Sequence, residues 1–150
     1  HKYDNIHIGM AARMDTIQAA ILIEKISIFP EEISKRRNIA QRYNENLSNL
    51  KNVLIPDYHQ GSTWAQYTIQ VDPAKREEIQ KRLSQAGIPT QIYYPIPLHR
   101  QKAYKEYPIS GKELLVSDHL AASVLSLPLH PYISDIEQDH ICETLKKSII

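Results

Sequence analysis

The segment from Tyr93 to His99 (YYPIPLH) holds the residue types best suited to chemistry on a ligand. Two phenols and an imidazole stand within seven residues, and each can take part in hydrogen bonds. Proline lacks an amide hydrogen and fixes φ, so Pro95 and Pro97 exclude a helix interior or a central strand and extend the chain. The segment therefore predicts a rigid wall whose rings cover the apolar face of a polar ligand. An ordinary proline-rich connection with half-buried tyrosines is an equally open alternative.

Complete catalytic machinery is not recognisable elsewhere. The sequence has no glycine-rich phosphate loop, no Gly-x-Ser-x-Gly pattern and no zinc-type pairing of histidines with cysteines. His140 and Cys142 are two residues apart and would point from different faces of a helix, so we interpret Cys142 as a buried small hydrophobe rather than a catalytic thiol. For His99 and His130, each between prolines and apolar residues, packing is the simpler interpretation of either residue alone.

The composition argues against two classes of partner. The 150 residues, one domain's worth, include 18 basic and 17 acidic side chains, and a net charge of +1 gives no field for nucleic acid or an anionic membrane. The basic run at 35–37 leaves a nucleic-acid alternative open, but a solvated helix face is favoured. No apolar run is long enough to span a membrane, and one cysteine excludes an intrachain disulfide, so we expect a cytoplasmic protein.

Hydrophobic periodicity predicts helices around a small sheet. The expected helices cover 14–28, 31–50, 73–86, 101–107, 112–125 and 135–147, and the expected strands cover 64–71, 89–94 and 125–129. We expect Pro30 to separate the first two helices, Gly87 to cap the third, and Ser134 with Glu137 to form a capping box on the last. This order predicts an α/β domain of the α+β type, with about three mainly antiparallel strands and helices on one face. The helix over 14–28 is apolar around much of its surface, so we expect it to face a partner or a second domain.

Three segments in a fixed order carry a family resemblance. They are Gly9 to Ala20 (GMAARMDTIQAA), Tyr94 to His99 (YPIPLH) and Leu125 to Tyr132 (LSLPLHPY). Together they resemble the C-terminal part of the DegT/DnrJ/EryC1/StrS sugar aminotransferases, and the pattern Arg-Met-Asp-x-x-Gln-Ala-Ala is specific to that family. The resemblance covers essentially all 150 residues. It is closest to the branch that aminates a UDP-linked 3-keto sugar of the N-acetylglucosaminuronate type.

The resemblance implies that residues 1–150 form the C-terminal small domain of a PLP-transferase fold, preceded by a long interdomain helix. The family's large N-terminal domain carries the lysine that binds pyridoxal phosphate, and no lysine here matches that motif, so we expect the chain alone to be inactive. A chain beginning at His1 agrees with a piece of a longer protein. The implied reaction moves an amino group from glutamate to a nucleotide-linked keto sugar in a homodimer. The alternative is a non-catalytic module that binds a sugar nucleotide or an aminotransferase.

The resemblance also assigns residues near the start of the chain. The family has an asparagine, which contacts the cofactor phosphate across the dimer, where this sequence has Ala11. A methyl group cannot donate a hydrogen bond, so the contact is lost, or Asn5 or a backbone amide replaces it. Arg13 is implied to grip the sugar carboxylate, because a guanidinium fork matches that planar anion. A salt bridge with Asp15 or Asp4 is the structural alternative for Arg13.

The remaining assignments concern the sugar pocket. Tyr93 and Tyr94 are implied to line it, although the first of these positions is often histidine in that branch. His99 and His130 are implied to shape the pocket rather than to transfer protons. The resemblance assigns no catalytic residue and no metal ligand to this chain.

Overall fold

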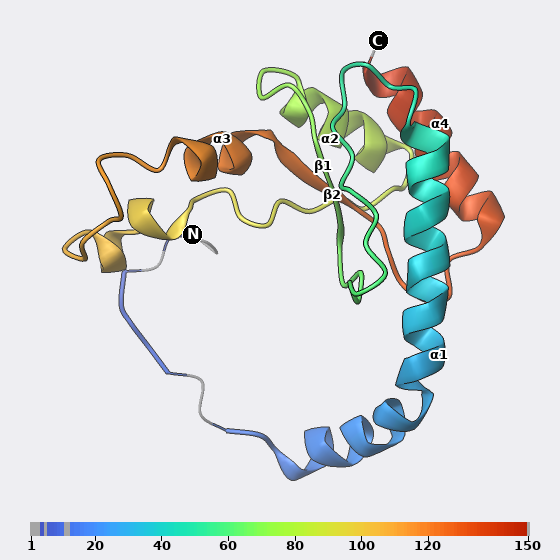
Figure 1. Cartoon of the computed structure of the whole chain (residues 1–150), viewed down its shortest axis with the longest axis horizontal. Coiled ribbons are helices and arrows are strands. Elements are labelled where there is room, and N and C mark those ends of the chain that lie inside the picture. Colours follow the sequence, from blue (N-terminus) through green and yellow to red (C-terminus); the bar gives the residue numbers. More distant parts are fainter. Residues whose placement is uncertain (1–3, 5, 11–12, 150) are drawn as a thin grey trace.

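The computed structural model describes residues 4, 6–10 and 13–149 (Figure 1). The chain forms, in order, α1 (Thr16–Leu47), β1 (Tyr67–Gln70), α2 (Arg76–Gln85), α3 (Leu115–Ser123), β2 (Val124–Leu127) and α4 (Asp135–Ile149). Two 3-10 turns, Leu98–Arg100 and Lys102–Tyr104, replace the short helix expected over 101–107. The predicted α+β class is confirmed. No helix among the described residues is long and apolar enough to cross a membrane.

The core lies between the sheet and three helices. β1 and β2 are antiparallel, with Tyr67 opposite Leu127 and Ile69 opposite Leu125, so these four buried side chains share one face. Each helix on that face adds large buried side chains: Tyr43 and Leu47 from α1, Ile79 and Leu83 from α2, and Ile141 and Leu145 from α4. The expectation of helices on one face of the sheet therefore holds, whereas α3 lies away from this layer (Figure 1).

The sheet has two strands instead of about three. The expected strand over 89–94 is reduced to one bridge, in which Gln91 and Ser126 exchange both backbone hydrogen bonds. The next hydrogen-bonded pair would place Pro89 opposite Pro128, and neither proline has an N–H to donate. In the other direction, the Val124 N–H already donates to a carbonyl at the end of α3. No further pair of backbone hydrogen bonds can therefore form on either side of the Gln91–Ser126 bridge.

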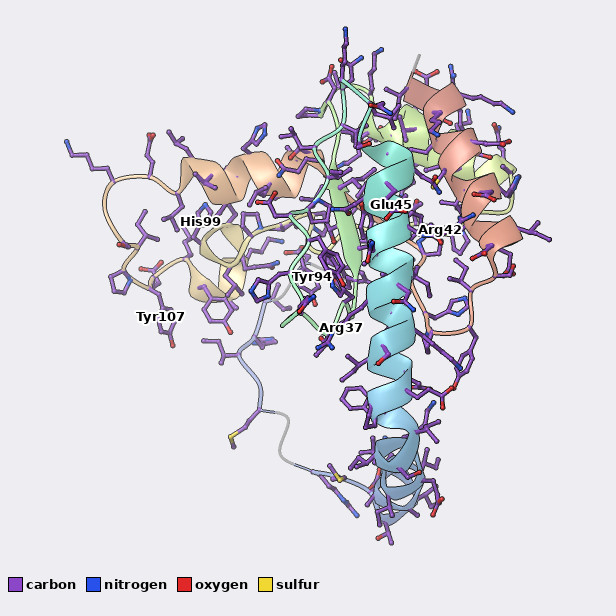
Figure 2. The ribbon with its side chains drawn as sticks, turned by 45° about the vertical axis from the view of Figure 1, so that its right-hand side comes forward. Arg37, Arg42, Glu45, Tyr94, His99 and Tyr107 are labelled. Carbon is purple, nitrogen blue, oxygen red and sulfur yellow. The ribbon has the colours of Figure 1, made fainter. Side chains whose placement is uncertain are left out.

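Pro30 lies inside α1, so the prediction that it separates two helices was wrong. The missing N–H removes one bond of the helical ladder, and α1 bends in this region in both views (Figures 1 and 2). An ion pair crosses the bend, because Lys25 Nζ lies 2.8 Å from Glu32 Oε1. Helix continues on both sides because the sequence around the proline is helix-forming and the later half packs into the core.

The predicted caps of two other helices are confirmed. Gly87 has a φ of 77° after α2, and the N–H of Ile88 donates to the Leu83 carbonyl at 2.9 Å, which completes a Schellman motif. At the start of α4, the Ser134 N–H donates to Glu137 Oε2 at 2.8 Å and the Glu137 N–H donates to Ser134 Oγ at 3.2 Å.

The loop between β2 and α4 (residues 128–134) runs along α1 and is tied to it by side chains. Three hydrogen bonds join them: Tyr43 Oη to the Pro128 carbonyl at 2.8 Å, a guanidinium nitrogen of Arg36 to the Leu129 carbonyl at 3.3 Å, and Tyr132 Oη to Glu32 Oε1 at 2.6 Å. Positions 32, 36 and 43 share one face of a helix with 3.6 residues per turn. The loop therefore follows a single stripe of α1.

Candidate functional site

The wall predicted over 93–99 lines a pocket of about 450 Å³. One side of the pocket is the segment 93–98 with Gln101, and the opposite side is α3 with the start of β2, at Ser117, Leu120, Ala121 and Val124. The prediction that the prolines keep this segment extended was wrong, because the chain bends at residues 93, 95 and 96 and turns into a 3-10 helix at Leu98. The pocket is mostly apolar, with tyrosine hydroxyls, an amide and a serine hydroxyl at its edges. Such a lining suits a ligand that has one apolar face and several polar groups.

Tyr93 and Tyr94 line this pocket, which is called the tyrosine pocket below. The ring centroids of Tyr93 and Tyr94 are 5.5 Å apart and the rings meet at 70°, edge to face. Tyr94 is 61% exposed and Tyr93 is 37% exposed, so both rings can reach a ligand. The buried Gln101 supports the wall, since its amide donates to the Ile96 carbonyl at 3.2 Å. Pro97 lines the pocket with these residues, and the role of the segment in binding a ligand stays a prediction.

His99 lies next to this pocket and not in it. Its Nε2 is 3.0 Å from Asp118 Oδ1 on α3, and its side chain is only 10% exposed. Arg100 donates to both oxygens of the same carboxylate, at 3.1 and 2.7 Å. The Arg100 hydrogen bond, more than His99, holds the pKa of Asp118 below its ordinary value. His99 also lines a neighbouring pocket of about 400 Å³ with Tyr104 and Tyr107. Asp118 therefore fixes His99 between the two pockets.

In the view of Figure 2, Tyr94 lies between α1 and the lobe that carries His99 and Tyr107. His130 is on the β2–α4 loop, is exposed, and accepts the Tyr132 N–H at 3.3 Å through Nδ1. It does not line the tyrosine pocket. The structure thus brings Tyr93 and Tyr94 together, sets His99 beside them, and leaves His130 on a separate loop.

Arg13 stands just before α1, away from the tyrosine pocket. Its Nε is 3.3 Å from Asp15 Oδ1 and its side chain is 89% exposed. It borders a shallow hollow of about 360 Å³ with Met14 and Ile21. Of the two carboxylates considered as partners, Asp15 makes the contact, whereas Asp4 pairs with Lys102. Ala11, the position of the family's asparagine, lies outside the described residues.

Two further interpretations concern single features. Cys142 is 2% exposed and burial raises its thiol pKa to about 11, which confirms a buried hydrophobe instead of a nucleophile. The basic run at 35–37 is half-buried, so the interpretation as a solvated face was wrong. Lys35 pairs with Glu31 at 2.7 Å, and Arg36 donates to loop carbonyls. Arg36 therefore holds two loops against α1, whereas the Lys35–Glu31 pair lies within the helix.

Sequence reasoning missed the side chains that position the wall. Gln101 and Asp118 carry no motif, and Asp118 reaches His99 across 19 positions in the chain. Only the fold brings such residues together. Among the described residues, no group of three or more His, Cys, Asp or Glu side chains is placed to hold a metal ion.

A family model for the DegT/DnrJ/EryC1/StrS aminotransferases matches residues 1–146. The chain belongs to this family. It is 39% identical over 146 residues to the UDP-2-acetamido-2-deoxy-3-oxo-D-glucuronate aminotransferase of Pseudomonas aeruginosa, covering 96% of this chain and 39% of that protein. The predicted family is thereby confirmed.

Solved structures agree with this membership. A DegT DnrJ EryC1 StrS aminotransferase from Brucella abortus is 44% identical with a TM-score of 0.84, over 98% of this chain and 39% of that one. NtdA from Bacillus subtilis, solved with bound cofactor PMP, is 31% identical with a TM-score of 0.79, over 97% of this chain and 34% of that one. The chain thus spans about two fifths of the length of the relatives it matches.

The tyrosine pocket does not by itself fit a pyridoxal phosphate site. Such a site needs a lysine for the aldehyde and donors or cations for the phosphate. The tyrosine pocket is lined by no lysine, arginine or histidine. Its rings, amide and hydroxyls instead suit the polar and apolar faces of a sugar.

Proposed function

We propose that this chain is the C-terminal small domain of a pyridoxal phosphate-dependent aminotransferase of nucleotide sugars, and that it forms the sugar-facing side of the active site. The observation that carries the proposal is the pocket walled by Tyr93 and Tyr94, in a chain that matches the family over nearly its whole length. The cofactor and its lysine belong to the part of the longer protein that this chain does not include.

The proposed reaction converts a keto sugar and glutamate into an amino sugar and 2-oxoglutarate. The preferred substrate is a UDP-linked 3-keto uronate, because the relative from Pseudomonas aeruginosa, named for such a substrate, is 39% identical. The residues of this chain bind and orient that sugar: the tyrosine rings cover its apolar face and their hydroxyls meet its polar groups. Apolar side chains from α3 exclude water from the opposite side.

Arg13 is proposed to bind the uronate carboxylate. Its guanidinium is paired with an exposed aspartate, so it can exchange that partner for a substrate anion at little cost. Because Arg13 is distant from the tyrosine pocket of its own chain, the proposal includes a homodimer in which one copy's Arg13 serves the other copy's pocket. Ala11 remains the position at which the family's phosphate contact is expected to be missing.

The exposed apolar half of α1 supports the same assembly. Large apolar side chains there are all exposed: Ile17, Ile21, Leu22, Ile23, Ile26 and Phe29. A surface of this kind is normally covered by a partner or a second domain. We include a cytoplasmic location in the proposal, in line with the single buried cysteine.

The test uses the longer protein encoded by the reading frame that contains this chain. Incubated with glutamate and a UDP-linked 3-keto uronate, it should produce the amino sugar and an equal amount of 2-oxoglutarate, both measured by mass spectrometry. A dTDP-linked 3-keto-6-deoxy sugar, which lacks the carboxylate, should react much more slowly. Binding of the UDP sugar without any transfer of nitrogen would favour the non-catalytic binding module instead.

A further inference from the structure

The bend at Pro30 divides α1 into two halves with different surroundings. The buried residues of α1 all follow the proline, at positions 32, 39, 40, 43 and 47. The first half, residues 16–29, is exposed except for partial burial at position 19. Packing in the core therefore fixes the direction of the second half but not that of the first, and Arg13 is carried at the start of the first half.

Two side chains meet on the inner side of this bend. At 100° per residue, positions 25 and 32 are about 20° apart around the helix, whereas position 30 is about 140° from position 25. A proline ring crowds the preceding turn and bends a helix away from its own side, so Lys25 and Glu32 face each other across the inside of the bend. Their 2.8 Å contact joins the two halves.

A third side chain ties this pair to the rest of the fold. Tyr132 Oη donates to the same oxygen of Glu32, Oε1, at 2.6 Å. The Glu32 side chain is only 10% exposed, so its carboxylate depends on these partners for its hydrogen bonds. Tyr132 is itself held, because its N–H donates to His130 Nδ1 and Lys35 Nζ lies 5.4 Å above its ring.

We propose that Lys25, Glu32 and Tyr132 form a clamp that sets the bend of α1 and thereby the position of Arg13 relative to the core. The lysine holds the first half of the helix, the glutamate belongs to the second half, and the tyrosine anchors both to the β2–α4 loop. The hydrogen bonds lower the pKa of Glu32, with Lys25 contributing most, and Glu32 raises the pKa of Lys25, so the charged pair persists near neutral pH. The link to Arg13 rests on the proposed function, whereas the bend itself does not.

The direction of the first half can be measured with two spin labels, at Ala20→Cys on α1 and Glu143→Cys on α4. Both sites are exposed, and the buried Cys142 should stay unlabelled. Ala20 is about 15 Å along the helix from Pro30, so a change in bend of about 20° moves it by roughly 5 Å. Double electron–electron resonance, with excess unlabelled chain present, resolves such a shift within one molecule.

Glu32→Gln and Tyr132→Phe should each broaden the distance distribution and move its mean by several ångströms. The matched control is Glu78→Ala, which breaks an exposed pair with Arg82 on α2, has no part in the clamp and should leave the distribution unchanged. Tyr132→Phe removes one hydroxyl from an exposed residue, so its fold should be retained even if Glu32→Gln lowers stability. Unchanged distributions in both variants, or an equal shift in the control, would overturn the clamp. The measurement needs no substrate, so its failure is distinct from a failure of the proposed function.

Discussion

Replacing Arg13 with alanine separates a role in substrate binding from a structural role. The side chain is 89% exposed and forms an ion pair with Asp15, itself 63% exposed. Surface pairs of this kind are worth less than about 1 kcal/mol, so Arg13→Ala should leave the stability of the chain nearly unchanged. A bidentate charge-assisted contact with a substrate carboxylate is worth about 2 to 4 kcal/mol, or roughly thirty- to a thousand-fold in kcat/KM.

The assay follows each half-reaction separately in the longer protein. Arg13→Ala should slow amination of a carboxylated keto sugar by that factor while the reaction with glutamate changes little. Arg82→Ala is the matched control, since Arg82, half-exposed, is also an arginine paired with a surface carboxylate, Glu78. Equal losses in both half-reactions would assign Arg13 to the cofactor or to the fold. If Arg13→Ala lowered the free energy of unfolding much more than Arg82→Ala does, the Arg13–Asp15 pair would have a structural role.

Three further perturbations test other parts of the account. Tyr43→Phe removes a buried hydroxyl that donates to a loop carbonyl, so it should lower the free energy of unfolding in urea by about 1 to 2 kcal/mol. The control Tyr107→Phe, on an exposed ring, should change that free energy by less than about 0.5 kcal/mol. Equal effects of the two variants would contradict this prediction. In the folded chain the hydrogen bond from Arg100 lowers the pKa of Asp118 below its ordinary value. The charged Asp118 therefore stabilises the fold at any pH above its ordinary pKa, and this stabilisation is lost as the pH falls through the lowered pKa. Urea titrations from about pH 5 downward should therefore show a steeper loss in the parent than in Asp118→Asn, and parallel curves would refute it. The isolated chain should self-associate through α1 in light scattering on a dilution series, and Ile21→Lys should weaken this; a monomer at high concentration would mean that the apolar half is covered otherwise.

The parts of the fold that could be predicted from sequence are those governed by local patterns. Gly87 and the Ser134–Glu137 box ended and began helices as expected, because a cap depends on a few neighbouring residues. Pro30 was misjudged because its effect depends on what surrounds the helix, including a pair seven residues apart and a loop from the far end of the chain. Contacts of this kind cannot be predicted from the residues immediately around the proline.

The candidate site divides in the same way. The place of the pocket wall, at Tyr93 and Tyr94, could be predicted from the aromatic residues beside the alternating prolines, but its shape could not, because the chain bends at residues 93, 95 and 96 where an extended backbone was expected. The side chains that support it could not, because Gln101 turns back to a carbonyl and Asp118 reaches His99 from another helix. The expected third strand did not form for a related reason. Pro128, just after β2, has no N–H to donate to the Pro89 carbonyl, so the pairing stops at the Gln91–Ser126 bridge.

Hydrogen exchange in the longer protein, with and without a UDP-linked uronate, tests most directly whether this chain supplies the sugar side of the site. The account predicts slower exchange in 93–101 and 120–124, which line the tyrosine pocket, on addition of the ligand. It predicts no change in 51–54 and 70–79, which line a separate pocket of about 400 Å³ and serve as the internal control. Protection confined to the second pair of segments, or absent from both, would contradict the assignment of the tyrosine pocket to the sugar.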